Sequence, residues 1–108
     1  MASLVLVCWR DIPAQVIAKA GRRTAKRQLS ERFEMAIDRA AMRSGMRGTD
    51  AYLGEWRRVD GGACGDDLEA AVEERAARLE QEFTDDLLKD MVASGGYRAP
   101  EKPDQDKA

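Results

Sequence analysis

The most apolar stretch of the chain lies near its beginning, where Ser3–Trp9 reads Ser-Leu-Val-Leu-Val-Cys-Trp. A near-continuous apolar run rich in β-branched and aromatic residues is typical of a strand that is buried on both faces. Pro13 breaks the pattern, because it lacks an amide donor and holds Ile12 in an extended conformation. The alternation over residues 14–20 then predicts a hairpin partner with one solvent-exposed face. The chain therefore begins with a central strand and its neighbour.

The next periodic segment predicts a helix that ends before Gly45. Apolar residues recur on one face at about 100° per residue, with Phe33 and Ile37 among them. Ser30 is a good N-terminal cap, and Gly45 suits the left-handed conformation that ends many helices. We expect the helix to start at Ser30, and a start at Thr24 is the alternative.

Residues 52–59 fit two structures. Tyr52 and Trp56 alternate with other residues as in a third strand, whereas Thr49 could cap a short helix over the same segment. We favour the strand, because Gly54 weakens a helix and aromatic side chains suit a sheet.

Two further helices are expected after a glycine-rich loop at residues 60–65. An apolar stripe at helical spacing predicts the first, over about residues 66–82. Thr84 then provides a fresh cap for a short final helix, which the glycine pair at 95–96 ends. From 97 to 108 the chain is polar and interrupted by proline, so we expect a disordered tail there.

This order of elements, strand, strand, helix, strand, helix and helix, predicts an α+β fold. We expect a small antiparallel sheet of about three strands, with two to three helices on one face. The 108 residues suffice for one domain, over residues 1–96, followed by the tail at 97–108. The uncovered face of the sheet is then a candidate site of action.

The chain contains no histidine, which excludes Ser-His-Asp and Cys-His catalysis within the chain and any histidine-ligated metal. Its two cysteines, Cys8 and Cys64, are far apart in the sequence and cannot complete a four-ligand zinc site. The sequence also lacks a phosphate-binding glycine motif with its lysine. We therefore expect no catalytic residue, no metal and no cofactor, and we favour a non-enzymatic protein.

The apolar run at the start of the chain is too short for a signal peptide or a membrane span, and no basic segment precedes it. We expect a cytoplasmic protein without a membrane partner. Positive charge is in excess over residues 1–60 and negative charge over residues 61–108. This asymmetry favours complementary halves within one domain or a homodimer, and steering of a charged partner is the alternative.

One surface of the first helix is a candidate site for a protein partner. At 100° per residue, Met35 and Met42 fall opposite the apolar face, and Arg39 and Arg43 lie to one side of them. Flexible methionines with charged neighbours are typical of adaptable binding surfaces. The other interpretation, which we favour from the sequence, is that the C-terminal helices cover both methionines and the whole helix is buried.

A second candidate site combines cationic and aromatic residues of the strands. We expect it to bind a small anion or a cofactor on a sheet surface, through five residues: Trp9, Arg10, Trp56, Arg57 and Arg58. Nucleic acid is a further candidate partner, for a basic cluster with aromatic residues that could stack on bases. The cluster consists of Arg22, Arg23, Lys26 and Arg27, with Arg32, Arg39 and Arg43 on the helix, and the aromatic residues are Trp9, Tyr52 and Trp56. The sequence pI of about 5.2 and the small number of aromatic residues argue against that partner.

Residues 29–42 (LSERFEMAIDRAAM) and 49–58 (TDAYLGEWRR) resemble the small bacterial domain family labelled "virulence factor". The resemblance also takes in residues 9–13 (WRDIP) and covers residues 3–94. It implies neither an enzymatic activity nor a toxin, and it carries over no catalytic or binding residue. Some relatives are fused to an iron–sulfur-scaffold-type domain and to helical repeats, and stand-alone members occur beside corrinoid-dependent methyl-transfer genes. The resemblance therefore implies an accessory or assembly role.

Together these observations lead us to expect a non-enzymatic accessory or adaptor domain that binds a cytoplasmic protein. Cofactor assembly or corrinoid-dependent, one-carbon methyl transfer is the context that the resemblance implies. The alternative is a small-anion or cofactor-handling protein that uses the Arg- and Trp-bearing sheet surface.

Overall fold

The computed structural model describes residues 2–46 and 48–98. Within them, four antiparallel strands form one sheet in the order β3-β2-β1-β4. The strands are β1 (Ser3–Trp9), β2 (Ile12–Ala20), β3 (Arg23–Gln28) and β4 (Trp56–Ala63). The helices are α1 (Glu31–Arg43), α2 (Asp50–Gly54), α3 (Leu68–Glu82) and α4 (Asp85–Ala93). The predicted α+β fold is confirmed, with one more strand and one more short helix than expected.

The apolar strand β1 lies inside the sheet, between β2 and β4. Its Val5 pairs with Ile17 on one side and with Asp60 on the other. Leu4 pairs with Gly62, so Gly61 is an extra residue in β4 at this point. A Cβ atom on Gly61 would lie 3.0 Å from the Cβ atom of Leu4, and glycine therefore permits the close approach of the two strands.

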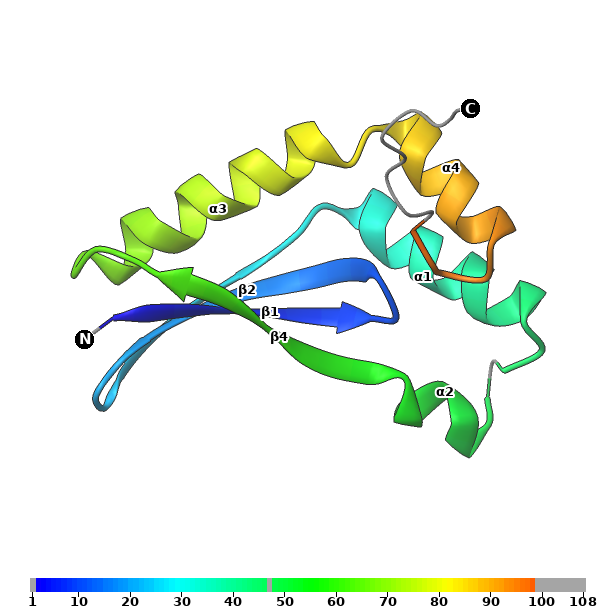
Figure 1. Cartoon of the computed structure of the whole chain (residues 1–108), viewed down its shortest axis with the longest axis horizontal. Helices are drawn as coiled ribbons and strands as arrows, with labels where there is room; N and C mark the ends of the chain where they lie inside the picture. The colour runs from blue at the N-terminus through cyan, green and yellow to red at the C-terminus, as the bar shows by residue number, and fades with distance from the viewer. Residues whose placement is uncertain (1, 47, 99–108) are drawn as a thin grey trace, which may run out of the picture.

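The helices cover the sheet unevenly (Figure 1). Helix α3 packs against β2 and β3, where Val16, Ala18 and Ala25 are buried. Helices α1 and α4 pack against each other, and α1 also contacts β2. Trp9 and Ile12, at the turn between β1 and β2, are fully buried. On the face of the sheet that α3 covers, β1 and β4 are therefore less covered by helices than β2 and β3.

Strand β3 replaces what we expected to be loop or the start of a helix at Thr24. Its sequence is Arg-Thr-Ala-Lys-Arg-Gln, and Ala25 is its only buried residue. The sequence of this strand therefore shows no alternation of apolar and polar residues. β3 is an edge strand, and exposed charged residues are common on edges because they discourage pairing with other chains. The expected helix start is confirmed, since Ser30 is the N-cap residue immediately before α1.

The favoured strand over residues 52–59 is wrong for its first half. Thr49 caps α2 by accepting a hydrogen bond from the backbone amide of Tyr52, as in the alternative structure. The strand begins at Trp56 and continues through the expected glycine-rich loop as far as Ala63. The tertiary contact from Trp9 explains the change, since its indole Nε1 donates to the Tyr52 carbonyl oxygen over 2.9 Å.

The first two residues of the expected tail contact the rest of the domain. The Tyr97 ring lies 4.6 Å from the guanidinium carbon of Arg10. The backbone amide of Arg98 donates to Asp11, and its guanidinium forms an ion pair with Glu82 at 2.7 Å. The expectation of a disordered tail therefore does not hold for residues 97 and 98, and residues 99–108 lie outside the described residues.

Candidate functional site

The surface of α1 that carries Met35 and Met42 is exposed to solvent. The helix buries an apolar stripe that includes Phe33 and Ile37, and Phe33 packs against Phe83 with ring centroids 5.9 Å apart. Met35 and Met42 lie away from this stripe and are 44% and 54% exposed. The C-terminal helices therefore leave both methionines in contact with solvent, because α4 packs beside them rather than over them.

A groove of about 330 Å³ runs between α1 and α4 beside Met35. Its apolar part consists of Met35, Ala36, Leu88 and Val92, and Arg32, Arg39, Asp85 and Lys89 complete the lining. Arg43 is tied to α4, since its Nε donates to the Ala93 carbonyl oxygen over 3.2 Å. The structure thus places Met35 and Arg39 on one groove, with Arg43 and Met42 further along the same helix.

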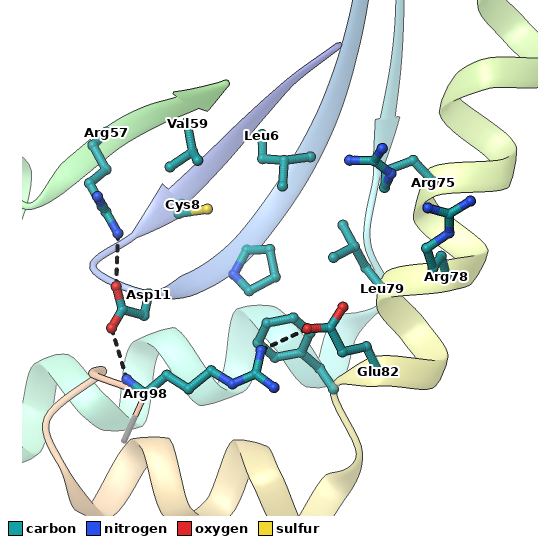
Figure 2. Close-up of a pocket in the computed structure, with 12 residues that line it drawn as sticks. Leu6, Cys8, Asp11, Arg57, Val59, Arg75, Arg78, Leu79, Glu82 and Arg98 are labelled. Carbon is teal, nitrogen blue, oxygen red and sulfur yellow. Dashed lines mark hydrogen bonds and ion pairs between the residues drawn. The ribbon is translucent and has the colours of Figure 1, made fainter. Parts of the chain in front are cut away.

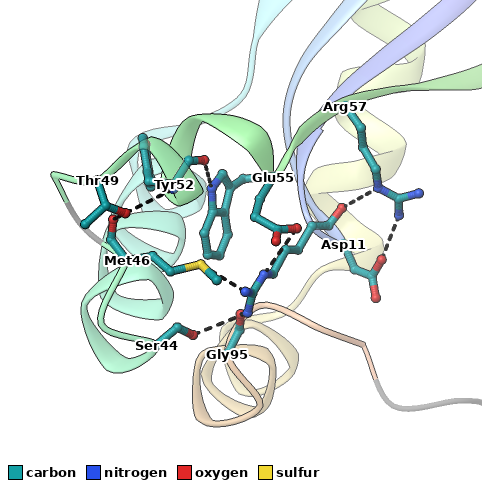
Figure 3. A network of polar contacts seen from close by, with 10 residues as sticks. Asp11, Ser44, Met46, Thr49, Tyr52, Glu55, Arg57 and Gly95 are labelled. Atoms are coloured by element: carbon teal, nitrogen blue, oxygen red, sulfur yellow. Dashed lines mark hydrogen bonds and ion pairs between the residues drawn. The ribbon is translucent and has the colours of Figure 1, made fainter.

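Two residues of the predicted sheet-face site lie inside the fold. The Trp9 side chain is fully buried, and Arg10 is only 9% exposed. The Arg10 guanidinium donates to the Gly95 carbonyl oxygen over 2.7 Å and to the Ser44 hydroxyl over 3.3 Å (Figure 3). Its carbon atom lies 4.9 Å from the centre of the Trp9 ring. Arg10 therefore holds the C-terminal end of α4 against the β1–β2 turn and is not open to a ligand.

The other three residues of that predicted site do not share one face of the sheet. Trp56 is half-buried and meets Tyr52 edge-on, at 6.2 Å between ring centroids. Arg57 donates to the Arg10 carbonyl oxygen over 2.9 Å and forms an ion pair with Asp11 at 2.8 Å. Arg58, the next residue of the strand, is exposed on the other face of the sheet. The structure does not bring the five residues together on one surface.

Arg57 faces a cleft of about 850 Å³ between α3 and the strands β1 and β4 (Figure 2). The strands provide Leu6, Cys8, Pro13, Val59 and Arg57, α3 provides Arg75, Arg78, Leu79 and Glu82, and Asp11, Phe83 and Arg98 complete the lining. Arg75 and Arg78 were not among the site residues predicted from the sequence. The signal that could have found them is their three-residue spacing beside the apolar stripe of α3, which puts them on one side of the helix.

The floor of this cleft contains the buried thiol of Cys8. Burial raises the pKa of the Cys8 thiol to about 11, although the nearby Arg57 guanidinium acts in the opposite direction. At neutral pH the thiol is therefore protonated and contributes a small, weakly polar surface to the floor.

The family model described as "Virulence factor" matches residues 7–92, which is most of the chain. The chain belongs to the virulence factor family. The resemblance stated from residues 9–13, 29–42 and 49–58 is thereby confirmed. No curated protein and no solved structure matches the chain.

The matched region of this virulence factor domain contains both surfaces described above. It includes α1 with Met35, and the cleft residues Arg57, Arg75 and Arg78, whereas Leu6 and Arg98 of the cleft lie outside it. Over residues 2–46 and 48–98, the structure contains no helix long and apolar enough to cross a membrane.

Proposed function

We propose that this domain is a non-enzymatic accessory or adaptor protein that binds a cytoplasmic protein partner through α1 and the groove beside α4. The observation that carries the proposal is the exposure of Met35 and Met42 on a helix that otherwise buries its apolar residues. Exposed methionines are adaptable contacts, because the unbranched thioether side chain can repack against differently shaped partners.

The chemistry of the groove indicates the kind of segment that fits it. Its apolar residues, Met35, Leu88 and Val92, suit the apolar side of an amphipathic helix or an extended segment. Arg39 and Lys89 are exposed at its rim, and neither forms an ion pair within the described part of the chain. A partner segment with carboxylates beside its apolar residues is therefore the best match.

The pathway in which the partner acts remains part of the proposal. The family resemblance supports cofactor assembly or corrinoid-dependent, one-carbon methyl transfer as the setting. In such a setting, the domain contributes a binding surface and another protein carries out the chemistry.

The proposal is tested by replacing Met35 with glutamate. A carboxylate at this exposed position costs little in the free domain, whereas it must be desolvated in an apolar contact. We expect Met35→Glu to keep the wild-type melting curve by circular dichroism and to weaken partner recovery by roughly tenfold or more in pull-downs at native expression level.

Leu53→Glu is the matched control, because Leu53 is also an exposed apolar residue, at 65%, but belongs to α2. A protein recovered equally by the wild type and Leu53→Glu, and lost with Met35→Glu, supports the proposal. Equal recovery with all three chains excludes this surface. Recovery of no protein with the wild-type chain overturns the proposed function itself.

A further inference from the structure

The cleft beside α3 exists because one helix covers only half of the sheet. Neighbouring strands lie about 4.8 Å apart and a helix with its side chains is about 10 Å across, so a four-stranded sheet has room for two helices on one face. In this domain α3 packs mainly on β2 and β3. The surface of β1 and β4 next to α3 remains as a cleft of about 850 Å³. Small-molecule sites in proteins have volumes of about 300–1,000 Å³.

The floor of the cleft is apolar. Leu6 and Val59 of the strands are half-buried, and Leu79 of α3 closes the opposite side. Phe83 lies at the end where α3 stops, so an apolar body placed in the cleft meets aliphatic and aromatic carbon. This surface favours binding of an apolar group by removing it from water.

The walls of the cleft are cationic. Four guanidinium groups line it against two carboxylates, those of Asp11 and Glu82. These carboxylates already have partners, since Asp11 pairs with Arg57 and Glu82 with Arg98. The two cations of α3, Arg75 and Arg78, are therefore the groups left to meet a ligand.

Arg75 is the better placed of the two. It is half-buried, and its guanidinium forms no hydrogen bond or ion pair with any residue that the structure describes. Figure 2 shows its side chain extending from α3 into the cleft. Arg78 makes only a long contact, 3.8 Å from Glu74, and both side chains of that pair are mostly exposed. A guanidinium that is partly removed from water and lacks a partner gains most from a charged acceptor, which it binds by paired hydrogen bonds.

We propose that this cleft is a binding site for a small amphipathic anion, with a carboxylate or phosphate on Arg75 and Arg78 and an apolar body on Leu6, Val59 and Leu79. The site is separate from the α1–α4 groove, and it holds whether or not that groove binds a protein. Arg75 and Arg78 also line an adjoining hollow of about 420 Å³ near Cys64, so an elongated body has space on both sides of the anionic group.

The experiment uses octanoate and octyl phosphate as probes, with acetate, inorganic phosphate and 1-octanol as comparisons. A ligand that binds the folded state alone raises the melting temperature. We expect one or both amphipathic anions to raise it at millimolar concentration, because they combine charge with apolar area. Acetate and inorganic phosphate lack the apolar chain, and 1-octanol lacks the charge, so we expect smaller effects from them. The relative effect of octanoate and octyl phosphate shows which anionic group the arginines prefer.

Arg75→Gln keeps a polar, helix-forming side chain and removes the charge. We expect it to raise the dissociation constant of the better probe by roughly tenfold to a hundredfold in isothermal titration, as for the loss of a charge-assisted hydrogen bond. Arg22→Gln removes the same charge from the exposed turn between β2 and β3 and should retain wild-type binding. Equal binding by Arg75→Gln and wild type, equal binding of 1-octanol and octanoate, or no binding of either amphipathic anion overturns the proposal.

Discussion

Gly96 lies against Trp9, the last residue of β1, and Arg10, the residue that follows it. Its backbone has φ +103°, and its amide donates to the Met91 carbonyl oxygen where α4 ends. The Trp9 ring and the Arg10 side chain approach it closely. These contacts explain at residue scale why the chain after α4 passes over the β1–β2 turn.

We expect Gly96→Ala to destabilise the domain by about 1–3 kcal/mol, because it combines a strained backbone with overpacking. A Cβ atom there would lie 2.8 Å from Cζ3 of the Trp9 ring. Urea unfolding gives the free energy directly. Gly65→Ala is the control, since a Cβ atom at Gly65 meets nothing within 4 Å. An unchanged midpoint for Gly96→Ala would show that Trp9 moves aside freely.

The first turn of α1 is attached to the last turn of α3 by Glu80. The Ser30 backbone amide and hydroxyl each donate to the Glu80 carboxylate over 2.8 Å, and Arg32 forms an ion pair with it at 3.2 Å. Ser30 thus occupies the expected capping position, although its hydroxyl binds Glu80 instead of a backbone amide of α1. This contact joins two elements that are 50 residues apart in the sequence.

The Glu80 contact predicts an acid-sensitive contribution to stability. Burial raises the pKa of the Glu80 carboxyl, but hydrogen bonds from Ser30 and Arg32 outweigh burial, and the net pKa is lowered. A lowered pKa in the folded state means that the contribution is complete above the ordinary glutamate pKa and is lost as the pH falls through the lowered value. We expect Glu80→Gln to cost about 1 kcal/mol at neutral pH.

The measurement is the unfolding free energy of wild type and Glu80→Gln as a function of pH. The difference between the two chains should shrink toward acid, since protonated Glu80 and glutamine are both neutral. Glu31→Gln changes an exposed residue of α1, the helix that Glu80 contacts, and controls for the loss of a carboxylate as such. A difference that is constant from neutral to acid pH contradicts the assignment to the ionised carboxylate.

Across the whole molecule, residues 97 and 98 connect the chain after α4 to two other segments, the β1–β2 turn and the end of α3. Arg98 contacts Asp11 after β1 and Glu82 at the end of α3, and its guanidinium carbon lies 5.1 Å from the centre of the Phe83 ring. Tyr97 lies over Arg10. These contacts close one end of the cleft beside α3.

We expect truncation after Gly96 to lower the unfolding free energy by more than about 1 kcal/mol, because it removes the contacts of Tyr97 and Arg98. Surface changes that remove no such contact usually alter the unfolding free energy by less than about 0.5 kcal/mol. A chain that ends at Arg98 keeps the described contacts and is the matched control. Thermal and urea unfolding of the two truncated chains measure the difference. Equal stability of both would mean that the contacts of Tyr97 and Arg98 contribute nothing measurable.

Local sequence patterns were sufficient for most elements of this domain. The apolar run of β1, the caps at Ser30 and Thr84 and the apolar stripes of α1 and α3 are signals within a few residues, and each element follows from them. Family membership was likewise visible in short segments of sequence and is confirmed over residues 7–92. Strand β3 was not predictable in the same way, because an edge strand with a single buried alanine carries no periodic apolar signal.

Tertiary structure alone decided what the charged and aromatic residues do. Neighbouring residues of a strand point to opposite faces, so Arg57 and Arg58 separate, while the β1–β2 turn places Trp9 and Arg10 beneath the end of α4. Arg75 became a candidate ligand group only because α3 covers β2 and β3 and leaves β1 and β4 open. Burial, pairing and the width of an uncovered sheet depend on contacts between distant segments, whereas capping and periodicity depend on near neighbours. That difference in range is the physical reason why the sequence determined the elements and the folded chain determined the sites.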